Sequence, residues 1–359
     1  MTVRIGIIGT GGISRSHLVN LVCNPDVEVV GLCDIVAEQI DKTRQVVNRH
    51  VDKEIEAGRS AKKLDAAAYS DYREMLRKEH LDGVYLCLPP YVHGDPEEAV
   101  IEAGIPVLIE KPVTLELPLA ARILDGIRRK GLINASGYQL RYSPQIAKAK
   151  EILSGKTIGM AVAMRFGGTP GTPWYTKQST CGGQLVEQAT HHVDQLRYLV
   201  GEVETVYASA ALRINNKDNP EYDIFDVNCM TMAFANGVTA NFANSLISGY
   251  GTPPEARGVH VFADGVTVSL PLGRPLRVIS SEGTQEFPDS SSPMALEDAA
   301  FVEAIKTGDA SLIKSDYLSG IRTLAVTIAG ERSARTGKPV NVPALLEAEA
   351  PNAALTGGK

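Results

Sequence analysis

A short apolar run followed at once by a glycine-rich turn opens the chain. Val3–Ile8 is rich in β-branched residues, and Gly9-Thr10-Gly11-Gly12-Ile13-Ser14 leads from it into a helical pattern. A buried parallel strand, a tight turn and a helix N-terminus form the place where the pyrophosphate of a dinucleotide binds. Gly9 suits the turn and Gly11 lets the backbone approach the phosphates. Ser14 replaces the usual third glycine, a small change that we expect helix–strand packing to absorb.

A second apolar run, Val27–Cys33, ends at Asp34, where an acidic side chain is expected to bind the ribose hydroxyls of the adenosine. A carboxylate there repels the 2′-phosphate of NADP, and no arginine follows at once, so NAD is favoured over NADP. The alternative is that Asp34 caps a helix N-terminus. The residues expected to hold the cofactor in this region are Gly9, Gly11, Gly12, Ile13 and Asp34.

Strand and helix patterns then alternate through the first 140 residues. A long helical insert spans Val36–Lys63, and strand patterns follow at Gly83–Leu88, Val107–Ile109 and Ile133–Tyr138. This spacing predicts a doubly wound parallel sheet, and ligands of such sheets bind beyond the carboxyl ends of the strands. The residues expected there as further cofactor contacts are Leu88, Pro89, His93, Glu110 and Lys111.

Lys111 lies between Glu110 and Pro112, directly after an apolar strand pattern. A cation fixed at this edge of the sheet can polarise a substrate oxygen and stabilise a developing alkoxide. The alternative is a solvated surface lysine paired with Glu110.

Composition narrows the class of partner. A chain of 359 residues is expected to form two domains, and its net charge of −6 without a cationic block argues against nucleic acid or an anionic membrane as partner. The five cysteines show no C-x-x-C spacing, so neither a disulfide framework nor a zinc site is indicated. With no apolar run of membrane-spanning length and no signal-peptide pattern, we expect a cytoplasmic protein.

Five stretches, taken in order, resemble the Gfo/Idh/MocA oxidoreductases, the family of glucose-fructose oxidoreductase and inositol dehydrogenase. They are Gly9–Ser14 with His17 after it, Leu88–His93, Glu110–Pro112, Gly137–Pro144 and Gly182–Gly201. The resemblance implies a Rossmann domain, placed at residues 1–140, followed by an α+β domain, placed at residues 141–343. The Ala/Gly-rich stretch over 344–359 is expected to be a loosely held tail. It also implies a nicotinamide cofactor, usually a sugar or cyclitol substrate, and an open, mostly antiparallel sheet that often serves as an oligomer interface.

The same resemblance assigns catalytic positions. The lysine of the family's E-K-P motif falls on Lys111, and its helix motif falls on Glu187 and His191, with a further aspartate at Asp194. Glu187 departs from the family, because a shorter aspartate is usual there. Independently, Glu187, His191 and Asp194 share one face of a predicted helix, and the glycine pair before it would let the backbone pass close to a ligand.

Oxidation of a secondary alcohol removes its hydroxyl proton and transfers a hydride to the nicotinamide. A histidine suits the proton step near neutral pH, so we expect His191 to act as the base, Lys111 to hold the alkoxide and Glu187 to orient the imidazole or a substrate hydroxyl. A competing assignment gives the proton transfer to Lys111. A metal site at Glu187, His191 and Asp194 is a less favoured alternative, and no metal is expected.

The second half shows strand-like runs separated by short turns such as Asp264-Gly265. A sheet covered on one face needs a partner on the other, so we expect a homodimer or homotetramer. Additional substrate contacts are expected from Trp174, because aromatic rings stack on sugars, and from Arg141 and Tyr142, with core or interdomain packing as the alternative for all three.

The leading prediction is an NAD-dependent dehydrogenase acting on a sugar, cyclitol or glycoside. One alternative is an NAD-dependent glycosidase that uses transient oxidation. Another is a non-catalytic protein that senses the cofactor, against which the presence of both Lys111 and His191 argues.

Overall fold

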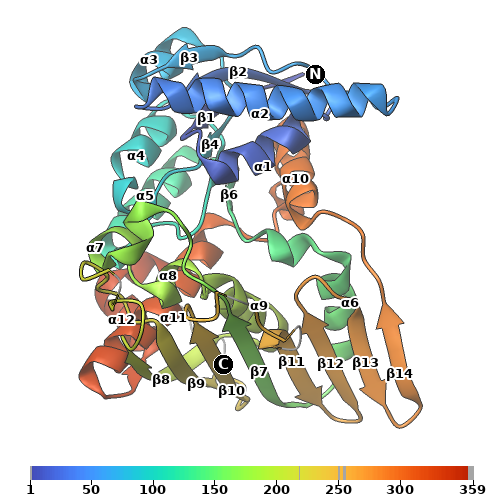
Figure 1. The fold of residues 1–359 in the computed structure, drawn as a ribbon, viewed down its shortest axis with the longest axis vertical. Helices are drawn as coiled ribbons and strands as arrows, with labels where there is room; N and C mark the ends of the chain where they lie inside the picture. The colour runs from blue at the N-terminus through green and yellow to red at the C-terminus, as the bar shows by residue number, and fades with distance from the viewer. Residues whose placement is uncertain (1, 218, 250, 254–255, 355–359) are drawn as a thin grey trace. The chain divides into compact units, whose positions relative to one another are not determined.

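The computed structural model describes residues 2–217, 219–249, 251–253 and 256–354. The chain forms two compact units (Figure 1). The first comprises Met1–Val113, Arg122–Gln139 and Ser292–Ser319, and the second comprises Thr114–Ala121, Leu140–Ser291 and Gly320–Lys359. The first unit is therefore discontinuous in sequence, because Ser292–Ser319 joins it after most of the second unit.

The first unit is built on a six-stranded parallel sheet, as predicted. Its strands are β1 (Val3–Ile8), β2 (Val27–Cys33), β3 (Ala67–Tyr69), β4 (Gly83–Leu86), β5 (Val107–Ile109) and β6 (Asn134–Ser136). They follow the order β3-β2-β1-β4-β5-β6, so the chain reverses direction across the sheet at β1 and β4. β3 was not predicted, because it is only three residues long and largely exposed.

Helices cover both faces of this sheet (Figure 1). They are α1 (Gly12–Leu21), α2 (Ala37–Glu56), α3 (Tyr72–Lys78), α4 (Asp95–Glu102), α5 (Leu117–Lys130) and α10 (Pro293–Thr307). α1 packs against α2 and α10, while α3 packs against α4. Apolar strand residues such as Ile5 and Ile7 are fully buried, with Leu18 of α1 and Phe301 of α10 in the same core.

The second unit is built on a nine-stranded sheet of order β14-β13-β12-β11-β7-β10-β9-β8-β15. Its strands are β7 (Ile158–Phe166), β8 (Val203–Ala211), β9 (Val227–Phe234), β10 (Thr239–Ser245), β11 (Arg257–Ala263), β12 (Val266–Pro271), β13 (Leu276–Ser280), β14 (Gly283–Phe287) and β15 (Val340–Asn341). Only β7 and β10 pair in parallel, which confirms the predicted mostly antiparallel sheet. The predicted Asp264-Gly265 turn joins β11 to β12.

Side chains along the strands alternate between buried and exposed. Helices therefore cover one face of this sheet and leave the other uncovered. The helices of the unit are α6 (Pro144–Leu153), α7 (Gln178–Cys181), α8 (Gln184–Glu187), α9 (Thr190–Val200), α11 (Tyr317–Thr336) and α12 (Val342–Glu349). α9 packs against β7 and β11, and α12 packs against β8. On the other face Met160, Tyr207 and Phe262 are among the exposed large apolar side chains.

The segment expected to be a loosely held tail is helical over much of its length. Leu345 and Leu346 of α12 are buried, as is Ala353, so residues 344–353 pack through apolar side chains. Residues 355–359 lie outside the described part of the chain.

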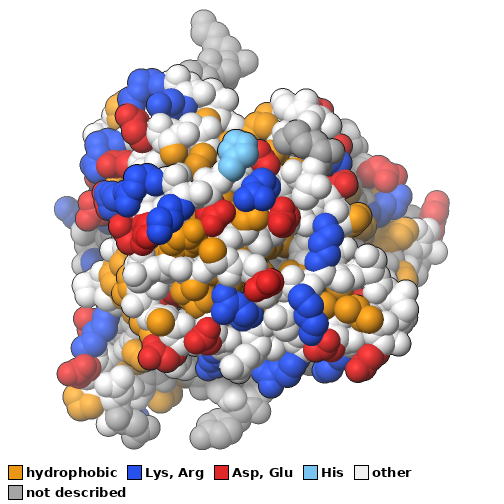
Figure 2. All heavy atoms as spheres, turned by 90° about the horizontal axis from the view of Figure 1, so that it is seen from above, with side chains coloured by type: hydrophobic (Ala, Val, Ile, Leu, Met, Phe, Trp, Pro, Cys, Tyr) orange, Lys and Arg blue, Asp and Glu red, His pale blue; other side chains and the backbone are white. Residues whose placement is uncertain are grey.

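The surface carries charges of both signs. On the face shown in Figure 2, acidic and basic side chains are interspersed with apolar ones. None of the helices in the described part of the chain combines the length and the apolar character that a membrane span requires.

Candidate active site

The glycine turn after β1 has the geometry that a phosphate cradle needs. Gly9 has φ +90°, and a Cβ at this position would lie 2.3 Å from the carbonyl oxygen of Cys87. A Cβ added at Gly11 or Gly12 would meet no atom within 4 Å, so the space beside the N-terminus of α1 is open. Unpaired backbone N–H groups of a first helical turn favour an anion in such a space, so these residues fit a dinucleotide.

Asp34, the residue after β2, is fixed beside this turn. One carboxylate oxygen accepts hydrogen bonds from the backbone N–H of Thr10 at 2.8 Å and from its hydroxyl at 2.9 Å. The other accepts from the N–H of Val36 at 2.9 Å. Asp34 is not the N-cap of α2, because that position is held by Val36. Its role in cofactor binding stays a prediction.

The loop that carries Lys111 is held by a buried glutamate. The carboxylate of Glu110, only 3% exposed, accepts a hydrogen bond from the backbone N–H of Lys111 at 2.9 Å. A side chain at Gly137 would place its Cβ 2.6 Å from this carboxylate, so only glycine leaves room for it. Glu110 therefore fixes the backbone of the Lys111 loop, whether or not it also contacts a cofactor.

A second partner holds Glu110 from the other side. Nε2 of His17 in α1 lies 3.0 Å from a Glu110 carboxylate oxygen, and Nδ1 of the same ring lies 2.6 Å from Asp298 in α10. Burial alone would lower the pKa of His17, but the charges and hydrogen bonds of Asp298 and Glu110 raise it well above its ordinary value. Asp298 and Glu110 therefore favour the protonated, positively charged form of His17. Sequence reasoning missed Asp298, and the only signal for His17 was its place after the glycine turn.

His93 is held by the start of α4. Its Nδ1 lies 2.5 Å from Glu97, which also accepts the backbone N–H of Gly94 at 2.6 Å. Nε2 of His93 is buried and has no hydrogen-bond partner among the described residues. Leu88 and Pro89 lie just beyond β4, the strand next to β5, so these candidates and the Lys111 loop share one edge of the sheet.

In the second unit, the predicted helix over Gly182–Gly201 is two helices, α8 and α9. Gln188 and Ala189 separate them, and the N–H of Ala189 bonds to the carbonyl of Gln184, five residues earlier. Glu187 is the last residue of α8 and is buried, whereas the half-buried His191 lies in the first turn of α9. The two candidates are thus carried by consecutive short helices.

The glycine pair before α8 has positive φ at both positions, +75° at Gly182 and +92° at Gly183. A Cβ at Gly183 would lie 2.4 Å from a carboxylate oxygen of Glu331 in α11. The close approach for which glycine is needed is therefore made to Glu331. A ligand at the same place stays a prediction.

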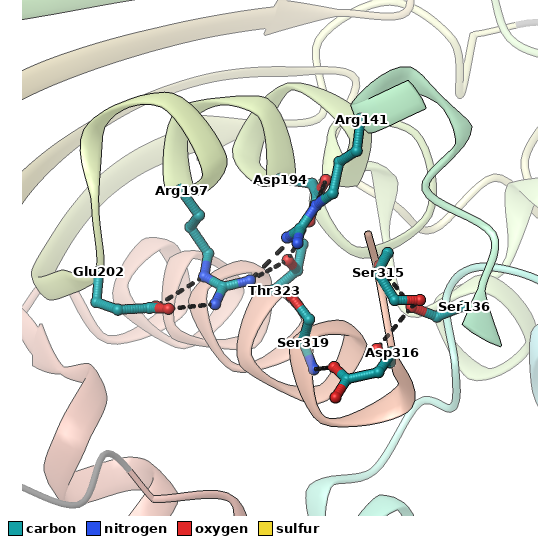
Figure 3. Close-up of polar contacts among 9 residues, drawn as sticks. All are labelled: Ser136, Arg141, Asp194, Arg197, Glu202, Ser315, Asp316, Ser319 and Thr323. Carbon is teal, nitrogen blue, oxygen red and sulfur yellow. Dashed lines mark hydrogen bonds and ion pairs between the residues drawn. The ribbon is translucent and has the colours of Figure 1, made fainter. Parts of the chain in front are cut away.

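Arg141 and Asp194 form a buried ion pair in the second unit (Figure 3). Two guanidinium nitrogens of Arg141 donate to the Asp194 carboxylate at 2.8 and 2.6 Å, and the hydroxyl of Thr323 donates to it at 2.8 Å. Arg197 donates to that hydroxyl at 2.6 Å and binds Glu202 through two nitrogens. The carboxylate of Asp194 thus forms its hydrogen bonds with other residues of the protein. Figure 3 also shows contacts of the first unit, in which the hydroxyl groups of Ser315 and Ser136, at the end of β6, form a hydrogen bond.

The arrangement does not gather Glu187, His191 and Asp194 as metal ligands. Among the described residues, the one trio of potential ligands within 4.8 Å of one another is Cys23, His50 and Glu54. Glu54 already forms an ion pair with Arg59.

The remaining substrate candidates lie in packed surroundings. Tyr142 is 4% exposed, and Trp174 is half-buried, with its ring 5.5 Å from that of Tyr175. Burial raises the pKa of Tyr175 well above its ordinary value, and the charge of Glu187 adds to the shift. A contact of Tyr142 or Trp174 with substrate stays a prediction.

Comparison with known families agrees with this geometry. Residues 3–138 match the model of an oxidoreductase family with an NAD-binding Rossmann fold, and residues 146–269 match the GFO/IDH/MocA C-terminal domain. The chain belongs to the Gfo/Idh/MocA oxidoreductase family. It is therefore an oxidoreductase that binds a nicotinamide dinucleotide in its first unit.

Several curated relatives align over most of the chain. An uncharacterized oxidoreductase, YrbE, of Bacillus subtilis is 27% identical, covering 94% of this chain and 96% of its own. The scyllo-inositol 2-dehydrogenase (NAD(+)) of the same organism is 24% identical, covering 95% and 96%. The myo-inositol 2-dehydrogenase of Thermotoga maritima is 26% identical, covering 74% and 76%.

Solved structures share the fold. A levoglucosan dehydrogenase in complex with NADH superposes with a TM-score of 0.82 at 18% identity, covering 96% of this chain and all of the other. A protein described as a putative myo-inositol dehydrogenase, from Sinorhizobium meliloti, gives a TM-score of 0.76 at 21% identity, covering 95% and 100%.

Proposed function

We propose that the protein is an NAD-dependent dehydrogenase that oxidises a secondary alcohol of a sugar, cyclitol or glycoside. The observation that carries the proposal is the rigid placement of the Lys111 loop, fixed through Glu110 by the buried His17. The backbone of Lys111 is held in this way at the ligand-binding edge of a dinucleotide-binding sheet. A lysine ammonium group in such a place is suited to stabilise negative charge on a reacting oxygen. The inositol dehydrogenases among the relatives support this class of substrate.

The candidate residues have the following tasks in the proposed reaction. A nicotinamide dinucleotide held by Gly9, Gly11 and Gly12 would supply the acceptor for the hydride of the alcohol carbon. His191 accepts the hydroxyl proton, Lys111 stabilises the alkoxide, and Glu187 orients either the imidazole or a substrate hydroxyl. The competing assignment, in which Lys111 takes the proton, uses the same residues.

Further contacts complete the proposal. Gly9, Gly11, Gly12 and Ile13 cradle the pyrophosphate, and Asp34 favours NAD over NADP by repelling a 2′-phosphate. Around the nicotinamide and the substrate, we assign contacts to the candidates Leu88, Pro89, His93, Glu110, Arg141, Tyr142 and Trp174.

The test is a cofactor-reduction screen over cyclitols, sugars and anhydrosugars with NAD⁺ and NADP⁺. We expect net NADH accumulation with at least one alcohol and a higher kcat/KM with NAD⁺. Lys111→Met and His191→Ala should each lower kcat/KM by about 10²-fold or more, the usual size of a lost acid–base or oxyanion contact. Activity unaffected by either substitution would contradict the proposed roles. Glycoside cleavage without net NADH would identify the glycosidase alternative, and cofactor binding without turnover would identify a sensor.

We also propose that the protein is a homodimer or homotetramer joined through the uncovered face of the nine-stranded sheet. Met160 of β7 and Phe262 of β11 are cross-strand neighbours on that face, 39% and 41% exposed. Exposed apolar pairs on an open sheet favour burial against a second copy.

A further inference from the structure

A polar row crosses one end of the helix-covered face of the nine-stranded sheet. The residues that lie side by side on β9, β10, β7 and β11 are Asn228, Asn244, Arg165 and Arg257. The next residues on the same face are apolar, namely Met230, Phe242, Ala163 and Val259. Buried polar groups cost free energy unless they are paired, so a row of two arginines and two asparagines at the end of a core points to a partner.

The two arginines line a cavity of about 510 Å³. Its lining includes backbone of the glycine-rich segments at Gly167–Gly168 and Gly249, where no side chain fills the space. Arg165 and Arg257 stand directly opposite each other on antiparallel strands, and such residues lie about 4.5–5.5 Å apart at Cα. Two positive charges are therefore adjacent beside one cavity.

The hydrogen-bond partners of the two arginines do not neutralise this positive charge. Arg165 is 8% exposed and donates to the side chain of Gln188 at 2.6 Å and to the carbonyl of Ser245 at 3.5 Å, both of which are neutral. Nε of Arg257 is buried with no hydrogen-bond partner in the described chain. The side-chain amides of Asn228 and Asn244 also lack partners there.

Arg141 and Arg197, which are buried in the same unit as Arg165, are neutralised, whereas Arg165 and the half-buried Arg257 are not paired with a carboxylate among the described residues. Arg141 and Arg197 each bind a carboxylate through two nitrogens. No ion pair within the described ranges includes Arg165 or Arg257. An unpaired buried guanidinium is costly, so the cavity is suited to a ligand that brings the missing negative charge.

The pKa shifts of neighbouring groups agree with an excess of positive charge at this cavity. Burial lowers the pKa of Arg165, and the charge of Arg257 lowers it further, whereas Tyr175 and Glu187 act in the opposite direction. Burial, followed by the charges of both arginines, lowers the pKa of His192 to about 3, so this neighbour stays neutral. Glu187 is thus the carboxylate whose charge acts on Arg165, and it acts against the effect of burial.

Arg165 links the cavity to the segment that carries the candidate catalytic residues of the second unit. Gln188, which accepts the hydrogen bond from Arg165, directly follows Glu187 in the chain. A ligand group held by Arg165 therefore lies next to the segment that leads from Glu187 to His191.

We propose that Arg165 and Arg257 bind an anionic group of the substrate, so that the alcohol oxidised by this enzyme carries a carboxylate or a phosphate. Guanidinium groups match both anions with paired hydrogen bonds, and the amide of Asn244 offers a further donor in the same row. This inference rests on the proposed function and narrows its substrate class.

The experiment compares matched substrates that differ in one group. Glucose, glucuronate and glucose 6-phosphate, and the corresponding galactose series, are assayed for NADH formation with the full-length protein. We expect kcat/KM for one charged member to exceed that of its neutral parent by about 10- to 100-fold, the worth of a charge-assisted hydrogen bond to a buried group. The carboxylate and phosphate arms decide which anion is bound.

Variants locate the effect. Arg257→Gln and Arg165→Gln should bring the ratio of charged to neutral kcat/KM close to one. Arg257→Lys should retain part of the preference, because it keeps the charge but loses the paired geometry. The control is Arg277→Gln on β13, an exposed arginine paired with Glu286, which should leave the ratio unchanged.

The outcomes separate this inference from the proposed function. If neutral alcohols are oxidised at least as well as charged ones, the anion site is wrong and the dehydrogenase stands. If no alcohol reduces NAD⁺, the dehydrogenase fails, and thermal-shift titrations with inorganic phosphate and with glucuronate decide the anion site. A saturable rise in melting temperature that Arg257→Gln abolishes supports it, and no rise overturns it.

Discussion

Glu110 illustrates what a local pattern can and cannot reveal about a residue. Its place after an apolar strand and before Lys111 predicted correctly that it lies at the carboxyl edge of the sheet. Its partner His17 is 93 positions away in sequence, and Asp298, which lies against the other nitrogen of that imidazole, is 281 positions from His17. Periodicity reports only neighbours within a few residues, so this network could not be predicted.

Replacing His17 tests this network. His17→Gln leaves Glu110 and Asp298 as two buried carboxylates without the positive charge between them, so we expect a loss of about 3–5 kcal/mol in the free energy of unfolding. Denaturant unfolding near pH 7 measures it. The matched control is His50→Gln in α2, where the ring lies 3.8 Å from Glu54 and is 36% exposed, with an expected change below about 0.5 kcal/mol. Equal stability of the two variants would show that the buried network contributes nothing.

At the scale of elements, strand-like runs in the second half were predicted where β7–β11 and β13 lie, but not where β12, β14 and β15 lie. β14 is mostly exposed and β15 has only two residues, so neither has a clear alternation of buried and exposed side chains. The helix over Gly182–Gly201 also keeps its periodicity across the two residues that divide α8 from α9. The pattern could not show either that Gly183 lies against Glu331, because Glu331 belongs to a helix distant in sequence.

The stability that Glu331 of α11 contributes, where it lies against the start of α8, is expected to depend on pH. Burial raises the pKa of Glu331 to about 7, while Arg335 and the backbone N–H of Leu185 oppose the shift. The folded state holds this proton more tightly than the unfolded chain, so the stability it contributes is full below about pH 4.5 and is lost as the pH rises through about 7. Between pH 5 and pH 8, Glu331→Gln should therefore gain about 2–3 kcal/mol relative to the wild type.

Urea unfolding at the two pH values measures that gain. Glu347→Gln on the exposed side of α12 serves as the control and should show no pH-dependent difference from the wild type. A constant difference between Glu331→Gln and the wild type at both pH values would show that the carboxyl group titrates as it does in the unfolded chain.

At the scale of the whole molecule, alternating strand and helix patterns followed by strand-rich sequence predicted both sheets. They did not predict that Ser292–Ser319 belongs to the first unit. This segment supplies α10, whose Phe301 packs in the core of the first unit. A helix pattern shows that a face is apolar without showing which sheet it covers.

Solution mass tests the proposed oligomer. Light scattering should give a dimer or tetramer, and Phe262→Asp should reduce the mass, because a charge replaces an apolar side chain on the uncovered face. Ile55→Asp in α2, also at an exposed apolar position, should leave the mass unchanged. A monodisperse wild-type monomer would contradict the proposed interface.

The central claim is that Lys111 and His191 act on the same alcohol, and a double-mutant cycle on kcat/KM tests it most directly. We expect Lys111→Met and His191→Ala together to cost little more than the more damaging single substitution, because residues that act on one reacting group are not additive. If the two losses multiply as independent effects, the residues serve separate sites and the account is wrong.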